Sequence, residues 1–197
     1  MRPFIALILC VSALFTHAIE EERWKLRAQN NGVDVSTQKV NGSSIDRFKA
    51  TAIIEADYEA VKEFILDYPN YPLWYENYKS GNILKRKDNG ELLVRFIINA
   101  PFPIKDRDSV NQVFIKQNEE RITIRLESQP NLIAKTKGLV RMSISSGEWK
   151  LVKAGNQTKV SLIYHADPEI PIPSWIANRY LVQGPLNSLL NLKKRIE

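Results

Sequence analysis

Cysteine and histidine are nearly missing from this sequence, which has one cysteine and two histidines in 197 residues. The cysteine, Cys10, and one of the histidines, His17, lie within the first 18 residues. A zinc site needs three or four ligands, and Ser-His-Asp or Cys-His catalysis needs a positioned imidazole. The other histidine, His165, stands in an alternating run with the parity of an exposed strand residue. We therefore expect no metal, no cofactor and, beyond residue 18, no disulfide.

Long apolar runs are also missing. The longest, Phe4–Phe15, has 12 residues, whereas a transmembrane helix needs about 20. Arg2 precedes this run and the small-residue site Thr16-His17-Ala18 follows it, which is typical of a secretory signal peptide. We predict that residues 1–18 are a signal peptide; a buried N-terminal helix is the alternative. The protein is then exported, and the lack of disulfides favours the periplasm, although two glycosylation sequons keep a eukaryotic secretory compartment open.

Residues 19–197 show no repeat or linker, and their length suits one domain. Loss of Arg2 with the signal peptide changes the formal net charge from +6 to +5. The basic residues are scattered among acids without the stripe that nucleic-acid binding needs, so we expect no nucleic-acid partner. The excess charge favours transient contact with an anionic membrane surface. The run Lys193-Lys194-Arg195 has a second explanation, since cations in the last turn of a helix offset its dipole.

Helical periodicity appears in two segments. Residues 58–68 form an amphipathic pattern, and a longer one runs over about 24 residues from 173 to 196. Gly184-Pro185 lies inside the second segment and predicts a kink there. We also expect a short helix at residues 20–29.

The rest of the chain alternates with a period of two. Strands are predicted at residues 33–35, 45–56, 82–87, 91–99, 107–117, 121–128, 138–153 and 158–166. The apolar parity changes at Ser145-Ser146-Gly147, which predicts a β-bulge. These elements indicate an α+β fold in which the closing helix covers the apolar face of a curved antiparallel sheet. The pattern leaves open whether the space between sheet and helix is packed or hollow.

Four motifs carry a resemblance to a known family. They are Leu66-Asp67-Tyr68 leading to Trp74, the segment from Ala100 to Val110, Gly138–Arg141 followed by Gly147-Glu148-Trp149, and Asp167-Pro168 followed by the segment from Ile172 to Asn178. In order and spacing these resemble START domains, the lipid-transfer modules related to the steroidogenic acute regulatory protein. The resemblance spans about residues 22–196. It implies a helix-grip fold, with an internal apolar cavity for a lipid or another hydrophobic molecule.

Candidate lining residues of this cavity lie on the predicted apolar faces. They are Phe96, Ile98, Val110, Phe114, Ile122, Ile124, Leu126, Val140, Met142, Trp149, Leu162, Tyr164, Ile176, Tyr180 and Leu181. Some family members hold a polar head between an acidic and a basic side chain. The corresponding positions here, near Val94 and Val113, are aliphatic, so we expect a mostly apolar site. By alternation, the neighbouring Arg95 should point outward.

Two further groups have expected roles. The resemblance implies that the loop 129–137 and the start of the last helix form a gate, with Leu132 and Ile133 as its apolar residues; ordinary packing under the loop is the alternative for this pair. The segment Asp106-Arg107-Asp108 contains two carboxylates, the pair that acid–base catalysis uses, but adjacent strand residues point to opposite faces and the two acids need not converge. We therefore expect Arg107 and Asp108 to fix the start of the strand through ion pairs and turn hydrogen bonds rather than to catalyse a reaction.

The sequence thus predicts a monomer that binds a lipid or another hydrophobic small molecule without catalysis, with transfer of that molecule as a further expectation. The alternative is an enzyme of the cyclase or hydrolase type that acts on an apolar substrate in the same cavity. The shortage of histidine and the apolar inner faces disfavour the enzyme.

Overall fold

The computed structural model describes residues 24–167, 173, 176 and 179–197. Within these residues ten strands form one sheet. In chain order they are β1 (Lys25–Asn30), β2 (Val33–Gln38), β3 (Arg47–Ile54), β4 (Tyr78–Arg86), β5 (Leu92–Ile98), β6 (Arg107–Gln117), β7 (Arg121–Ser128), β8 (Val140–Arg141), β9 (Ser145–Ala154) and β10 (Gln157–Ala166). Across the sheet the order is β1-β2-β3-β10-β9-β7-β6-β5-β4, with antiparallel neighbours, and β8 pairs with β6 in parallel. The predicted signal peptide lies outside the described residues.

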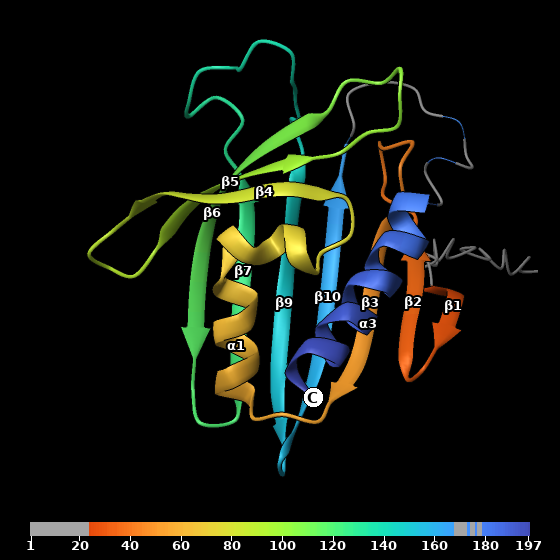
Figure 1. Cartoon of the computed structure of the whole chain (residues 1–197), viewed down its shortest axis with the longest axis vertical. Helices are drawn as coiled ribbons and strands as arrows, with labels where there is room; N and C mark the ends of the chain where they lie inside the picture. Colours follow the sequence, from red (N-terminus) through yellow and green to blue (C-terminus); the bar gives the residue numbers. More distant parts are fainter. Residues whose placement is uncertain (1–23, 168–172, 174–175, 177–178) are drawn as a thin grey trace, which may run out of the picture.

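Two helices pack on the same face of this sheet (Figure 1). The first, α1 (Tyr58–Leu66), begins where the Asp57 carboxylate accepts a hydrogen bond from the Glu59 amide at 2.9 Å. A 3-10 helix, Tyr68–Leu73, follows it directly. The other helix, α3 (Gly184–Ile196), ends the chain. The predicted α+β architecture, a curved antiparallel sheet with a long C-terminal helix, is confirmed.

The closing helix changes its winding at the predicted kink. A π-helical segment, Arg179–Gln183, runs directly into α3 at Gly184-Pro185. Proline has no amide hydrogen and its ring crowds the preceding turn, so a wider turn before it avoids the clash. Several residues of the predicted helix start, among them 174, 175, 177 and 178, lie outside the described part of the chain.

Two sequence predictions were wrong. The expected helix at residues 20–29 is wrong over its described part: residues 25–30 form strand β1, which pairs with β2 through the tight turn at Asn31-Gly32. This strand is exposed on both faces, so its sequence has no alternation to reveal it. The expected strand 138–153 is two strands, and β9 pairs with β7 and β10 without the predicted bulge. The change of parity instead comes from the break between β8 and β9.

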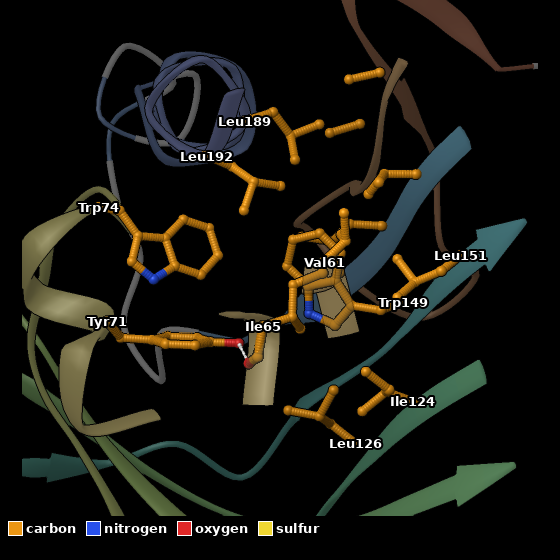
Figure 2. Packing of buried hydrophobic residues seen from close by; sticks show 14 of the residues in the cluster. Val61, Ile65, Tyr71, Trp74, Ile124, Leu126, Trp149, Leu151, Leu189 and Leu192 are labelled. Atoms are coloured by element: carbon orange, nitrogen blue, oxygen red, sulfur yellow. Dashed lines mark hydrogen bonds between the residues drawn. The ribbon is translucent and has the colours of Figure 1, made fainter. Parts of the chain in front are cut away.

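The core fills the space between the helices and most of the sheet. Val61 and Ile65 of α1 and Leu189 and Leu192 of α3 are fully buried against the inner face (Figure 2). The sheet contributes side chains such as Ile124, Leu126, Trp149 and Leu151. The Tyr71 hydroxyl donates to the Ile65 carbonyl at 2.8 Å, which ties the 3-10 helix to α1. This end of the molecule is therefore packed rather than hollow.

Asp108 holds the outer face of the sheet at the start of β6. Its carboxylate lies 2.7 Å from the Arg95 guanidinium and 2.8 Å from that of Arg141. The Arg141 guanidinium also donates to the carbonyls of Pro130 at 2.7 Å and Ile133 at 3.2 Å, in the loop that follows β7. Burial by itself raises the pKa of Asp108, but the hydrogen bonds from Arg141 and Arg95 outweigh it and leave the pKa below its usual value. One carboxylate thus joins β5, β6, β8 and the loop.

Asp108→Asn should lower the free energy of unfolding by about 3–5 kcal/mol at pH 7, because it leaves two guanidinium groups without their carboxylate. A carboxyl group with a lowered folded pKa stabilises the protein above its unfolded pKa, and that stabilisation is lost as the pH falls. The gap between parent and variant should therefore narrow below about pH 4. Urea unfolding at several pH values measures both effects.

Asp106→Asn is the matched control, since Asp106 also pairs with a cation, Lys79, at 2.5 Å, but that lysine is half exposed. Its cost should stay within about 1 kcal/mol. Equal losses for the two variants, or a gap for Asp108→Asn that does not change with pH, would contradict the assigned role of Asp108.

Gly147 on β9 lets β10 come close. A Cβ atom at this position would lie 2.2 Å from the ring of Tyr164 and 2.4 Å from the Ile163 carbonyl oxygen. The ring of Tyr164 therefore lies directly over the backbone of β9, where any other residue would push it away.

Gly147→Ala should destabilise the protein by about 1–3 kcal/mol, because the added methyl group overlaps a ring and a carbonyl that are both held by the sheet. Thermal unfolding followed by circular dichroism measures this, with Glu148→Ala on the other face of β9 as the control. Unchanged stability of Gly147→Ala would show that Tyr164 can move aside freely.

Candidate functional site

A cavity of about 150 Å³ lies at the end of the sheet away from the packed core, beneath the first turns of the closing helix. Its walls come from the start of β3, residues 75–78 and the end of β5 with the loop after it. The start of β6, the residue after β8, the start of β9, the end of β10 and the closing helix between Ile176 and Pro185 complete it. Most of its surface is aliphatic or aromatic, so the cavity suits an apolar guest.

Small residues explain why the interior is hollow here. Along the inner face of β9 the side chains are Ser145, Gly147, Trp149 and Leu151, and the first two are small. Trp149 and Leu151 are buried in the core, whereas Ser145 lines the cavity. The ring of Tyr164 occupies the space over Gly147, and the cavity opens beside this ring and the small side chain of Ser145.

Aromatic rings separate the cavity from the core. Tyr75 and Tyr78, both in the cavity wall, lie 4.4 Å apart between ring centroids. Tyr75 stacks on Tyr71 at 5.3 Å and meets Trp149 edge-on at 6.4 Å, and both of these belong to the core. The rings form a continuous partition, which stabilises the floor of the cavity through aromatic packing.

Three hydroxyl groups form a hydrogen-bonded cluster in the wall, which also contains the polar residues Glu76, Asn77, Asn99 and Arg107. The Ser145 Oγ and the Tyr164 hydroxyl lie 2.6 Å apart, and Tyr164 is also hydrogen-bonded to Tyr78. Burial raises the pKa of Tyr164 to about 12, although the hydrogen bonds from Ser145 and Tyr78 partly oppose the shift. Burial likewise raises the pKa of Tyr78 well above its usual value. All three groups are therefore neutral at physiological pH and can exchange hydrogen bonds with a guest.

Arg107 contributes the cation of the wall. Its guanidinium donates to the Lys105 carbonyl, and burial lowers its pKa. Nearby, the Tyr180 hydroxyl donates to the Asn99 carbonyl at 2.8 Å, which ties the closing helix to the end of β5. Arg107 faces the cavity while its neighbour Asp108 lies in the ion pairs of the outer face.

Six of the predicted lining residues do line the cavity: Ile98, Met142, Tyr164, Ile176, Tyr180 and Leu181. Six others lie in the packed core: Phe96, Ile122, Ile124, Leu126, Trp149 and Leu162. Val140 is half-buried in β8 and is not part of the cavity wall.

Val110 and Phe114 lie on the opposite face of β6. The inner positions of this strand are Ser109, Asn111 and Val113, because their neighbours on β5 and β7 point into the core. Val110 is covered instead by the loop after β7, whose Gln129 amide donates to the Val110 carbonyl. The Arg125 guanidinium lies 5.1 Å from the ring of Phe114. The residues of β6 that face the core are therefore the odd-numbered ones, not the even-numbered ones that were predicted. The sequence did not reveal this, because both faces of the strand are buried.

Two polar atoms on this inner face have no hydrogen-bond partner within the described part of the chain: Ser109 Oγ and Asn111 Oδ1. The amide of Asn111 donates to the carbonyl of Ser145, next to the hydroxyl cluster. This polar strip was not predicted from the sequence, because the apolar Val110 and Phe114 indicate the other parity for β6.

The gate residues lie outside the cavity wall. Leu132 is 56% exposed and Ile133 is half-buried, both in the loop 129–137. Arg141 holds the backbone of this loop, as described above. Gating by this pair stays a prediction.

Several residues of the wall were not predicted from the sequence. Phe48, Tyr75 and Tyr78 line the cavity, as does the loop from Ala100 to Ile104. The dense aromatic connector before β4 was a signal for Tyr75 and Tyr78, because so many rings within a few residues need a common place to pack.

Across the described residues, no three His, Cys, Asp or Glu side chains are arranged to hold a metal ion. No helix within those ranges is long and apolar enough to cross a membrane.

Comparisons with known proteins match this geometry to one family. The START domain model matches residues 14–196. An uncharacterized protein of Pseudomonas aeruginosa is 29% identical over 202 residues, which is 100% of this chain and 99% of that protein. The phosphatidylcholine transfer protein of Bos taurus is 22% identical, over 90% of this chain and 85% of its own length.

Among solved structures, the STAR-related lipid transfer protein of Xanthomonas axonopodis, a fragment of residues 25–204, superposes with a TM-score of 0.79. It is 28% identical, and the alignment covers 88% of this chain and 98% of that one. This superposition confirms the predicted helix-grip fold. The family model spans nearly the whole sequence. The chain belongs to the START domain family.

Proposed function

We propose that this protein binds one lipid or other hydrophobic small molecule, without catalysis, in the cavity beneath the closing helix, and transfers it between membranes. The observation that carries the proposal is the wall itself: mostly apolar side chains surround the hydrogen-bonded hydroxyls of Tyr78, Tyr164 and Ser145, with Arg107 and Glu76 as the charged residues of the lining. Such a wall takes an apolar body and orients one polar end. Two relatives, named for the transfer of lipid or phosphatidylcholine, support the same reading.

The size of the cavity sets how a guest enters. About 150 Å³ is the volume of a cavity that holds a benzene-sized molecule. Each buried methylene group contributes about 0.8 kcal/mol, so a long chain gains more than a ring if the walls separate to receive it. The movable wall is the π-helical segment Arg179–Gln183 with Ile176, because it is wound less regularly than α3 and lies directly over the cavity.

The enzyme alternative has less support. The cavity wall contains no histidine, and its phenols are poor bases because burial raises the pKa of Tyr164 to about 12. The wall also contains Arg107 and the carboxylate Glu76, but no histidine or metal site among the described residues completes an acid–base or nucleophilic arrangement with them.

For the rest of the chain, we propose that residues 1–18 are removed as a signal peptide and that residues 19–197 form the lipid-binding domain. The protein then works in the periplasm as a monomer that contacts membranes transiently and binds no nucleic acid. The order of charged, apolar and small residues at the N-terminus supports export.

Ile98→Trp should abolish lipid uptake, because the indole occupies the cavity from the end of β5. The protein is incubated with vesicles of phosphatidylglycerol and phosphatidylethanolamine, separated from them and examined by native mass spectrometry. We expect one lipid on the parent protein and less than a fifth of that on the variant. Ile53→Trp, a substitution at an exposed position of β3, is the control and should bind as the parent does.

Equal lipid on Ile98→Trp and the parent would place the lipid elsewhere. A parent protein that takes no lipid from vesicles, and carries none when purified from its host, would overturn the proposed function.

Tyr164→Phe should weaken binding of p-cresol by about fivefold, the effect of losing one neutral hydrogen bond. It should leave binding of p-xylene unchanged, because the two probes have nearly the same shape and differ in the hydroxyl group. Both fit a cavity of this size, and NMR titration measures both dissociation constants. Equal changes for the two probes would show that the hydroxyl cluster does not contact the guest.

A further inference from the structure

The most exposed large apolar side chain belongs to the loop that borders the cavity. Phe102 is 98% exposed, whereas the other exposed large apolar residues among those described range from 39% to 60%. A phenyl ring that stands fully in water loses the stabilisation it would gain by burial. It therefore has reason to enter an apolar phase.

The loop presents this ring in a fixed place. Prolines 101 and 103 flank Phe102 and restrict the backbone. The Ala100 amide donates to the Asp106 carboxylate at 3.0 Å, and the Ile104 amide donates to the Pro101 carbonyl at 2.8 Å. Because the two ends of the loop are held by these bonds, Phe102 extends from a built turn.

The same loop is part of the cavity wall. Ala100, Pro101 and Ile104 all line the cavity, on either side of the exposed ring. Any surface that receives Phe102 is thus brought to the edge of the cavity.

The charges around the ring fit an anionic surface. The loop 99–106 and the loop 129–138 lie at the same end of the molecule, at the top of Figure 1. Together they contain three lysines, Lys105, Lys135 and Lys137, all exposed, and one carboxylate, Asp106, which is paired with Lys79. The second loop adds another exposed apolar side chain, Leu132. Apolar tips among lysines are suited to a bilayer that has anionic headgroups above an apolar interior.

We propose that Phe102 is a membrane anchor: it enters an anionic lipid bilayer beside the cavity, with Leu132 as a second apolar contact and the three lysines over the headgroups. The anchor gives the proposed transfer function its docking surface and rests on that function for its purpose. Binding to the bilayer is nevertheless measurable without any guest in the cavity.

Co-sedimentation with vesicles tests the anchor, using phosphatidylcholine vesicles with and without 30% phosphatidylglycerol. Phe102→Ala should lower the partition coefficient on anionic vesicles about tenfold, and Phe102→Trp should restore it. Lys135→Ala should lower it about fivefold on anionic vesicles only, and less at high salt. Leu26→Ala is the control, since Leu26 is 60% exposed on the edge strand β1, and it should bind as the parent does.

Parent-like vesicle binding by Phe102→Ala would overturn the anchor. So would sedimentation equilibrium that shows a dimer of the parent dissociated by the same substitution, because the ring would then cover a second copy of the chain. Vesicle binding that depends on Phe102, in a parent protein that binds neither p-cresol nor lipid, would support the anchor and refute the proposed function. The two failures are therefore distinguishable.

Discussion

The size of two side chains on the inner face of β9 decides where this molecule is hollow. Further along the same strand Trp149 and Leu151 fill the core, whereas the small Ser145 borders the cavity and Gly147 has no side chain of its own. Gly147 also lets the ring of Tyr164 settle on the backbone, which brings its hydroxyl to Ser145. The cavity, its aromatic floor and its polar cluster all follow from that pair of positions.

A buried hydroxyl group needs a partner, and this requirement shapes the chemistry of the cavity. Tyr164 is hydrogen-bonded to Ser145 and Tyr78, so the cluster is stable without a guest and neutral when a guest arrives. The ion pairs of Asp108 with Arg95 and Arg141 lie on the other face of the sheet. Because adjacent strand residues point to opposite faces, β6 places Arg107 at the cavity and Asp108 under the loop after β7. Two adjacent residues thus have different roles: Arg107 lines the cavity, and Asp108 holds the outer face of the sheet through its ion pairs.

The overall architecture was predictable because strands with one wet face alternate clearly, and the ends of the closing helix carry strong signals. Ile98, Met142 and Tyr164 were predicted to line the cavity and do so. Alternation identifies an inner face, but it does not distinguish a residue in the core from one at the cavity, since both are apolar. For that reason Phe96 and Leu162 were predicted to line the cavity, although they lie in the core. The parity of β6 was not readable, because Val110 and Asn111 are both buried, one under a loop and one inside the sheet. Strand β1 was missed because it is an exposed edge that buries no regular face.

The central claim is that a hydrophobic guest occupies the space between the closing helix and the small residues of β9. Intermolecular nuclear Overhauser effects on the protein loaded with a perdeuterated-headgroup lipid test it most directly. The account predicts contacts from the acyl chain to the methyl groups of Ile98, Met142 and Leu181 and to the ring of Tyr164. Contacts confined to exposed side chains, with none to these four residues, would contradict it.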